Sequence, residues 1–336
     1  MNKTNETSSN HTCVTIGASP ISDLLMAIYI LAFTLGLVFN LITIGPIVQQ
    51  IQSKNVLGVY LLNLSISDLL YVFTMPLWIY YYSNDHKWDL GQYVCSLAGF
   101  FYYTNMYLSI YLLCCISVDR CLAVTYPLRS KSFRQMRHAW AVCLILVFVV
   151  LSLHLVVLYM DNLKDPLDDR GQRCYETFPI TGHLATINLL RVCMGFLIPL
   201  LILGVSYWRI LIKVWRSSGA DTQIKRKVKA LSVGVISIFT ICFAPYHILL
   251  LVRSIAFQVM NTEDYCALEQ TLHFPFSCTL ALSSLNCLVD PLLYVLVSNG
   301  VREDMRLCCW GRRESTLSSS GSQNGTRKNT KLTSLY

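Results

Sequence analysis

Long apolar runs separated by short polar segments form the main pattern along this chain. Seven such runs lie at approximately residues 22–50, 57–82, 92–126, 136–160, 184–216, 227–257 and 268–298. A helix needs roughly 20 apolar residues to cross a hydrocarbon layer about 30 Å thick, so each run is long enough to span a membrane. The pattern therefore predicts an all-α membrane protein built as a seven-transmembrane helix bundle.

The composition supports a location in a bilayer. Of the 336 residues, 54% are hydrophobic and only 14% are charged, and the mean hydropathy is +0.48. These values are too apolar for an ordinary soluble domain. The formal net charge of +8 comes mostly from basic loop residues, so it does not indicate nucleic acid as a partner.

Basic residues mark the loops that we expect on the cytoplasmic side. After the third span and between the fifth and sixth spans stand Arg129, Lys131, Arg134, Arg137, Lys213, Arg216, Lys225, Arg226, Lys227 and Lys229. The N-terminal segment instead carries Asn-x-Thr sequons at Asn2, Asn5 and Asn10. We therefore expect a multi-pass plasma-membrane protein with a glycosylated, extracellular N-terminus. No cleavable signal peptide is recognised, so the first span is expected to direct insertion itself.

These features divide the chain into four parts. We expect an extracellular segment at 1–21, a seven-helix domain at 22–298, a short amphipathic helix on the membrane surface at 299–310 and a disordered, phosphorylatable tail at 311–336. The short helix contains Cys308 and Cys309, where palmitoylation would hold it on the inner leaflet.

Among the 14 cysteines, four lie in segments expected outside the cell, where disulfides form. Cys95 begins the third span and Cys174 lies in the long loop after the fourth, which allows a bridge that holds this loop over the mouth of the bundle. Cys13 and Cys266 would then tie the N-terminal segment to the start of the seventh span.

An acid and a base, Asp119 and Arg120, end the third apolar run. Cys95 and Arg120 are 25 residues apart, a helical rise of roughly 38 Å, which puts Arg120 at the cytoplasmic surface. An isolated arginine there could simply extend its side chain into water. The neighbouring Asp119 could instead hold Arg120 in one state and release it in another, as a switch requires.

The chain resembles the rhodopsin-like G-protein-coupled receptors over nearly all of its length. The motifs are "GLVFN" with Asn40, "NLSISD" with Asp68, Cys95, "DRC" at 119–121, Pro199 and Tyr207, "FAPYH" with Phe243 and Pro245, and "DPLLY" with Asp290, Pro291 and Tyr294. The sequence departs from the family pattern at Cys121, Phe243 and Asp290, where tyrosine, tryptophan and asparagine are commoner.

The resemblance assigns a role to several residues. It implies that Arg120 meets a heterotrimeric G protein, that Tyr207 and Tyr294 move toward it on activation, and that Phe243 with Pro245 forms a toggle. Arrestin and receptor kinases are then expected partners of the tail. No enzyme activity is expected.

Two acids inside the membrane are expected to be functional, because ionisable side chains there are costly. Asp68 and Asp290 have Ser109 and Asn286 as candidate polar neighbours. Two nearby carboxylates disfavour joint ionisation, so the site would hold a sodium ion or a shared proton. The alternative is a neutral, hydrogen-bonded structural carboxyl. No other cofactor or metal is expected.

Arg191 is the most unusual cation, two turns before Pro199 in the extracellular half of the fifth span. We expect it to contact a carboxylate or phosphate headgroup, with a structural pair to an acidic loop residue as the alternative. Other residues expected to line the cavity are Arg253, His247, Tyr102, Tyr103 and Tyr246. Tyr102 replaces the acid that binds biogenic amines in the family.

Within the family, "MPLWIYY", "LLRVCMGFLIPL", "CFAPYHILLLVR" and "SSLNCLVDPLLY" look most like the proton-sensing and lysolipid receptors, nearest the oxidised-fatty-acid branch. Histidines expected in or near extracellular segments are His11, His86, His183 and His273, and histidine has a reference pKa of about 6.5. Val147 and Val150 lie in the region where acid-sensing relatives carry tryptophan and glutamate, which predicts a weak proton response.

The predicted function is therefore a receptor for a lysolipid, an oxidised fatty acid, protons or a combination of them. A receptor for another anionic ligand, such as a nucleotide or peptide, is the alternative. A membrane transporter is more distant, because the chain shows no internal repeats or matched interrupted helices.

Overall fold

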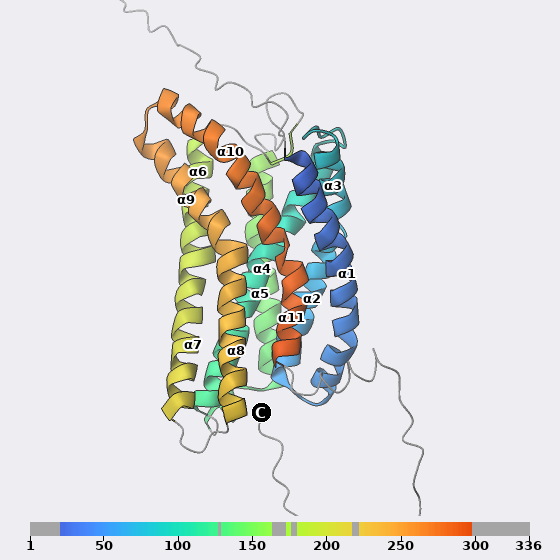
Figure 1. Ribbon diagram of the computed structural model, residues 1–336, viewed down its shortest axis with the longest axis vertical. Helices are drawn as coiled ribbons and strands as arrows, with labels where there is room; N and C mark the ends of the chain where they lie inside the picture. The colour runs from blue at the N-terminus through green and yellow to red at the C-terminus, as the bar shows by residue number, and fades with distance from the viewer. Residues whose placement is uncertain (1–20, 127–128, 163–172, 176–179, 217–221, 298–336) are drawn as a thin grey trace, which may run out of the picture. The chain divides into compact units, whose positions relative to one another are not determined.

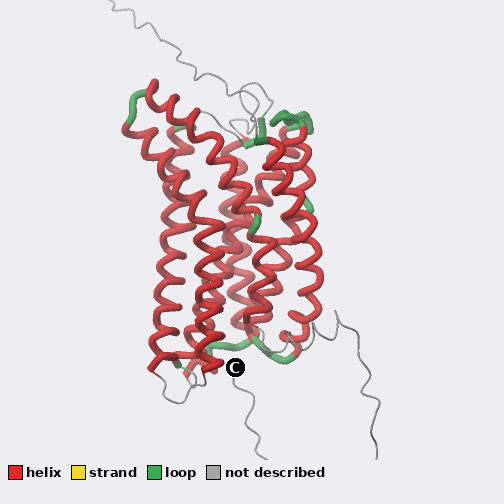
Figure 2. The backbone as a smooth tube through the Cα atoms, viewed as in Figure 1, coloured by secondary structure: helices red, strands yellow, loops and turns green. Residues whose placement is uncertain are grey.

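The computed structural model describes residues 21–126, 129–162, 173–175, 180–216 and 222–297. All of them belong to one compact unit, Met1–Asn299. Within these residues every regular element is helical, as Figure 2 shows. We name the end of the bundle near Cys95 extracellular and the end near Arg120 cytoplasmic, following the orientation predicted from the basic loops.

Seven helical segments among the described residues are long and apolar enough to cross a membrane. They are Ser22–Gln52, Val56–Ser83, Gln92–Thr125, Met136–Tyr159, Gly182–Arg216, Ser232–Val259 and Thr262–Leu292. The predicted all-α, seven-span architecture is therefore confirmed.

Several spans contain more than one helical element (Figure 1). The complete order is α1 (Ser22–Gln52), α2 (Val56–Val72), α3 (Met75–Ser83), α4 (Gln92–Thr125), η1 (Arg129–Ser132), α5 (Met136–Asn162), α6 (Gly182–Val192), η2 (Cys193–Leu197), α7 (Ile198–Arg216), α8 (Thr222–Ile238), η3 (Phe239–Phe243), α9 (Ala244–Val259), α10 (Thr262–Ser284) and α11 (Asn286–Val297).

Proline accounts for most of these interruptions, because it lacks the N–H that would bond to the carbonyl four residues earlier. Pro76 follows the break between α2 and α3. Pro199 and Pro245 each follow a π-helical segment, η2 and η3 respectively, by two residues. Such π-helical turns often occur at functional sites.

α4 is the central helix of the bundle. It packs against α2, α5 and α7, whereas α1 packs against α2, α3 and α11. α5 lies at the periphery, where large apolar side chains such as Phe148, 72% exposed, face outward. Exposed apolar residues on a long apolar helix suit contact with lipid.

Polar side chains begin three of the helices. Asn55 Oδ1 accepts the Leu57 amide, Thr181 Oγ1 accepts the Leu184 amide, and Asn261 Oδ1 accepts the Asp264 amide at 2.8 Å. Each contact satisfies a backbone donor that has no partner inside its own helix. Gly91 precedes α4 with φ = +84°, a conformation that favours glycine.

Candidate functional site

A cation lies over an aromatic ring near the extracellular end of the bundle. Arg191 is in the last turn of α6, and its guanidinium carbon is 4.8 Å from the centre of the Tyr103 ring of α4. Its Nη1 also donates a hydrogen bond to Asn188 Oδ1 at 3.3 Å. The structure thus brings together two residues predicted for the ligand pocket and holds the guanidinium on an aromatic face.

Two histidines and a tyrosine form a cluster within electrostatic range of Arg191. His154 of α5 stacks on Tyr107 of α4 with ring centres 5.6 Å apart, and His247 of α9 contacts the same ring at 6.0 Å. Each histidine Nδ1 donates to the carbonyl four residues earlier, which leaves Nε2 as an acceptor. Tyr107 Oη and His247 Nε2 are buried without a partner among the described residues. Such atoms favour a polar ligand group.

Stacked rings connect this cluster to the predicted toggle. Phe196 of η2 lies between Phe239 of η3 and His247, with centre distances of 5.4 and 5.0 Å. Phe239 in turn contacts Phe243 at 5.8 Å. The region before Pro245 therefore touches the histidine cluster through a continuous set of aromatic contacts.

The other two predicted pocket tyrosines have different neighbours. Tyr246 is buried, with its ring centre 4.9 Å from His247 and 5.7 Å from Phe276 of α10. Tyr102 instead shares a hydrogen bond with Ser283 of α10, with the two oxygens 2.5 Å apart. Tyr246 therefore belongs to the histidine cluster, whereas Tyr102 joins α4 to α10.

Arg253 is engaged in a buried ion pair. Its Nε and Nη2 donate to the two carboxylate oxygens of Glu269 at 2.7 and 2.6 Å, and its guanidinium carbon is 4.3 Å from the centre of the Phe276 ring. The Glu269 side chain is fully buried. This paired geometry occupies one edge of the Arg253 guanidinium and neutralises the buried Glu269 carboxylate.

The two intramembrane acids lie in one polar network at the centre of the bundle. Asn105 donates to Asp68 Oδ1 at 2.8 Å, and Asn286 donates to Asn105 Oδ1 at 3.3 Å and to Ser109 Oγ at 3.2 Å. Asp290 lies near Ser109 and Asn286 and within electrostatic range of Asp68. Asp68 Oδ2 and both Asp290 oxygens nevertheless accept no hydrogen bond from the described residues.

These unsatisfied oxygens fit a bound proton or cation, because burying an unpaired carboxylate is costly. Asp68, Asp290, Ser109 and Asn286 are the residues that would hold such a cation, which would supply the missing positive charge. Among the described residues, no group of three or more His, Cys, Asp or Glu side chains is arranged to hold a metal ion.

At the cytoplasmic end, Asp119 binds a residue that the motif does not include. Arg134, which lies just before α5, donates from Nε and Nη2 to the two Asp119 oxygens at 2.8 and 3.0 Å. Arg120 is farther away, with its Nη2 at 3.8 Å from Asp119 Oδ2. Tyr207 is buried within electrostatic range of Arg120, and the Tyr294 side chain lies outside the described part of the chain. Arg134 is therefore the stronger partner of Asp119.

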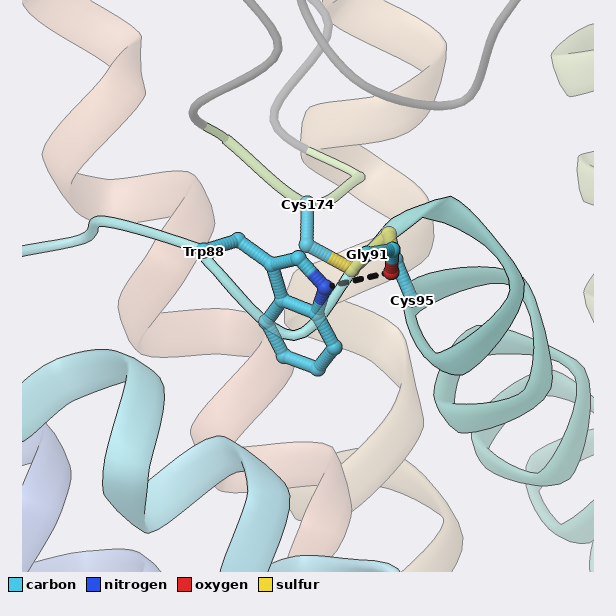
Figure 3. Close-up of a disulfide and its surroundings, with 4 residues drawn as sticks. All are labelled: Trp88, Gly91, Cys95 and Cys174. Carbon is cyan, nitrogen blue, oxygen red and sulfur yellow. Dashed lines mark hydrogen bonds between the residues drawn. A yellow bond between two sulfur atoms is a disulfide. The ribbon is translucent and has the colours of Figure 1, made fainter.

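The predicted bridge between Cys95 and Cys174 is present, with the two Cα atoms 5.6 Å apart (Figure 3). Figure 3 also shows Trp88 beside the bridge, where its Nε1 donates to the Gly91 carbonyl at 2.9 Å. The loop after α5 is therefore attached to the start of α4. Cys266 is disulfide-bonded too, and its partner lies outside the described residues.

Two of the predicted extracellular histidines are close together. The ring centres of His86, in the loop after α3, and His273 of α10 are 6.4 Å apart. His86 is buried against Tyr81 and Tyr82, at 5.4 and 5.0 Å, whereas His183 is exposed at the start of α6. Predicted sites outside the described residues are His11, Cys13, Cys308, Cys309, Asn2, Asn5, Asn10 and the surface helix at 299–310.

Several residues of these clusters were not among the predicted site residues, including Asn105, His154, Glu269, Arg134 and Tyr107. Asn105 is four residues before Ser109 on one helix, and His154 is ionisable inside an apolar span, so both had recognisable signals. Glu269 had no predicted role, and Arg134 was predicted only as a basic loop residue. Their partners are 16 and 15 residues away and belong to other elements, so no helical spacing pointed to them.

Seven helical segments long enough to cross a membrane, polar and aromatic groups near one end and a partly buried Asp119–Arg134 pair at the other are compatible with a transmembrane receptor. The sequence matches the 7 transmembrane receptor (rhodopsin family) over residues 39–294. The chain therefore belongs to the rhodopsin family of seven-transmembrane receptors, which are not enzymes and which couple to heterotrimeric G proteins.

Three curated mouse proteins show the similarity. "Probable G-protein coupled receptor 132" is 36% identical over 283 residues, 84% of this chain and 72% of that protein. "G-protein coupled receptor 68" is 36% identical over 280 residues, 83% and 74% of the two chains. "Lysophosphatidic acid receptor 6" is 31% identical over 293 residues, 85% and 83% of the two chains.

Proposed function

We propose that this receptor lies in the plasma membrane and responds to a single-chain lipid with an anionic headgroup, either a lysolipid or an oxidised fatty acid. The observation that carries the proposal is the position of Arg191 on the Tyr103 ring, within electrostatic range of buried polar atoms. The guanidinium can bind a phosphate or carboxylate, and the aromatic rings offer apolar surface for a hydrocarbon chain.

The comparison with other receptors agrees with this ligand class. One similar receptor is named for lysophosphatidic acid, which has a single chain and an anionic headgroup. Another anionic ligand, such as a nucleotide or peptide, is the alternative, because Arg191 would bind its phosphate or carboxylate equally well. The aromatic walls favour the lipid.

Protons are proposed as an additional or alternative agonist, on the observation that His86 and His273 lie 6.4 Å apart. Histidine is the side chain most often used as a pH sensor, and a proton on each ring would place two like charges in one small volume. The aromatic neighbours of His86 are Tyr81 and Tyr82, and Asp85 and Lys87 flank it in the chain. Repulsion would then separate α10 from the loop after α3.

The signal would pass through the central acids to the cytoplasmic switch. The network of Asp68 and Asp290 joins α2, α4 and α11, and Arg120 of α4 is the residue that would meet the G protein. Release of Asp119 from Arg134 would change the charge beside Arg120. Arrestin and receptor kinases are proposed partners of the C-terminal tail.

Replacing Arg191 with Ala is expected to lower lipid potency. Loss of a charge-assisted hydrogen bond costs about 1.5–3 kcal/mol, which corresponds to a roughly 10- to 150-fold rise in the half-maximal concentration. The measurement is a second-messenger dose response to a lysophospholipid and to an oxidised unsaturated fatty acid, at matched surface expression.

Two controls separate ligand binding from a structural role. Arg191→Lys keeps the positive charge but not the forked geometry of the guanidinium. Its lipid potency should therefore lie between those of the parent and Arg191→Ala. The pH response through His86 and His273 should be unchanged in both variants. Equal lipid potency in Arg191→Ala and the parent would assign Arg191 to a structural pair with an acidic loop residue.

A further inference from the structure

A cavity lies at the opposite end of the bundle from Arg191. It is a groove of about 340 Å³ along the cytoplasmic half of α4. Residues of α2, α5 and α7 border it, and the short segment before α5 closes its cytoplasmic end. Neither the proposed agonist pocket nor the central acids contribute to this groove.

The groove is apolar and opens toward the bilayer. Val118 of α4, Val142 of α5 and Ile202 of α7 line it and are 39%, 38% and 37% exposed. All three belong to segments that are long and apolar enough to cross a membrane. A hydrocarbon chain from the surrounding lipid can therefore enter from the side without crossing a polar layer.

The cytoplasmic end of the groove carries a cation with spare hydrogen-bonding capacity. Arg134 lines the groove, and its Nε and Nη2 are bound to Asp119. Its Nη1 donates no hydrogen bond to any described residue, and its side chain is 25% exposed. Arg120 adds a second positive charge beside the same carboxylate. Two guanidinium groups on one carboxylate leave a local excess of positive charge.

We propose that this groove binds a free long-chain fatty acid from the membrane. The carboxylate accepts a hydrogen bond from Arg134 Nη1, and the hydrocarbon chain lies along α4 toward Tyr111, which also lines the groove. Tyr111 and Leu122 are 11 residues apart on α4, about 16 Å of helix, which suits an extended chain.

The size of the cavity favours a single chain. Its volume is near the lower limit of ligand cavities, about 300–1,000 Å³, so it offers little room for a second chain. A fatty acid bound there contacts both the Asp119–Arg134 pair and the helix that carries Arg120. The site is therefore placed to modulate G-protein coupling separately from the extracellular agonist.

The test uses the full-length receptor in nanodiscs of zwitterionic lipid with a photoactivatable palmitic acid. We expect crosslinks in the peptides that contain Tyr111–Leu122 and Ala139–Leu146. Unlabelled palmitic acid should compete at least about tenfold better than hexadecanol, which has the same chain without the charge. Equal competition by the alcohol, or by two-chain phosphatidic acid, would show only general lipid contact and overturn the proposal.

Matched variants locate the site. Val142→Trp fills the groove from a lipid-exposed position and should abolish the crosslinks, whereas Leu144→Trp, 66% exposed and outside the groove, should keep them. Arg134→Gln should weaken competition by palmitic acid about tenfold and leave hexadecanol unchanged, whereas Arg137→Gln should change neither. Identical labelling of the two Trp variants would contradict the proposed site. This comparison does not depend on whether Arg134→Gln folds.

Discussion

Glu269→Gln is expected to lower the free energy of unfolding by about 3–5 kcal/mol, the usual cost of leaving one partner of a buried ion pair without the other. Glu269 is fully buried and binds both Nε and Nη2 of Arg253, a residue within α9. Gln can satisfy only part of this geometry and leaves the guanidinium charge uncompensated. The measurement is denaturation of the purified receptor in detergent micelles.

A double-mutant cycle shows whether the pair itself is responsible. The cycle measures Arg253→Met, Glu269→Leu and the double variant, which should recover most of the stability lost in each single variant, because apolar replacement of a buried pair is often neutral or stabilising. Glu263→Gln, at an exposed position in the first turn of the same helix, is the matched control and should change little. Additive losses in the double variant would mean that the two side chains do not depend on each other.

Asp68→Asn and Asp290→Asn are each expected to raise basal signalling or to flatten its dependence on pH. Asn imitates a protonated carboxyl, and activation is expected to close the central cavity and favour the neutral form. A change of about tenfold in the ratio of active to inactive receptor corresponds to about 1.4 kcal/mol. The measurement is basal second-messenger production at several pH values, with and without sodium.

The structure adds an asymmetry and a coupling to this prediction. Asp68 already accepts a hydrogen bond from Asn105, whereas both oxygens of Asp290 are unsatisfied among the described residues. Asp290→Asn should therefore have the smaller effect on stability. The double variant should differ from the sum of the single variants, because the two sites share one network. Unchanged basal signal, agonist response and pH profile in all three would make the pair structural.

The spans could be predicted from the sequence because a helix that crosses a bilayer must be long and apolar. The sequence contains seven runs of this kind. The interruptions beside Pro76, Pro199 and Pro245 were not predicted, although proline lacks the N–H that a continuous helix would use. The π-helical form of η2 and η3 was less predictable, because an extra residue in a turn depends on contacts with neighbouring helices. One such contact is at Gly195 in η2, where any Cβ would collide with the Tyr107 ring.

Individual residues of the candidate site could be predicted from motifs. Their interaction partners in the folded protein could not. Arg191 and Asp68 are ionisable residues in apolar spans. Placing such side chains in a membrane costs free energy, so a functional role could be inferred. That Arg253 would bind Glu269, and that Asp119 would bind Arg134, depended on how separate helices pack. The spacing of residues along the sequence does not show how the separate helices pack.

The most direct test of the proposed function is a second-messenger assay of the parent receptor over pH 6 to 8, with and without a lysophospholipid or an oxidised fatty acid. We expect a lipid response that Arg191→Ala weakens, and a small response to acid that His86→Phe with His273→Phe removes. Surface-expressed receptor that responds to neither lipid nor acid at any pH in this range would contradict the proposed ligand class.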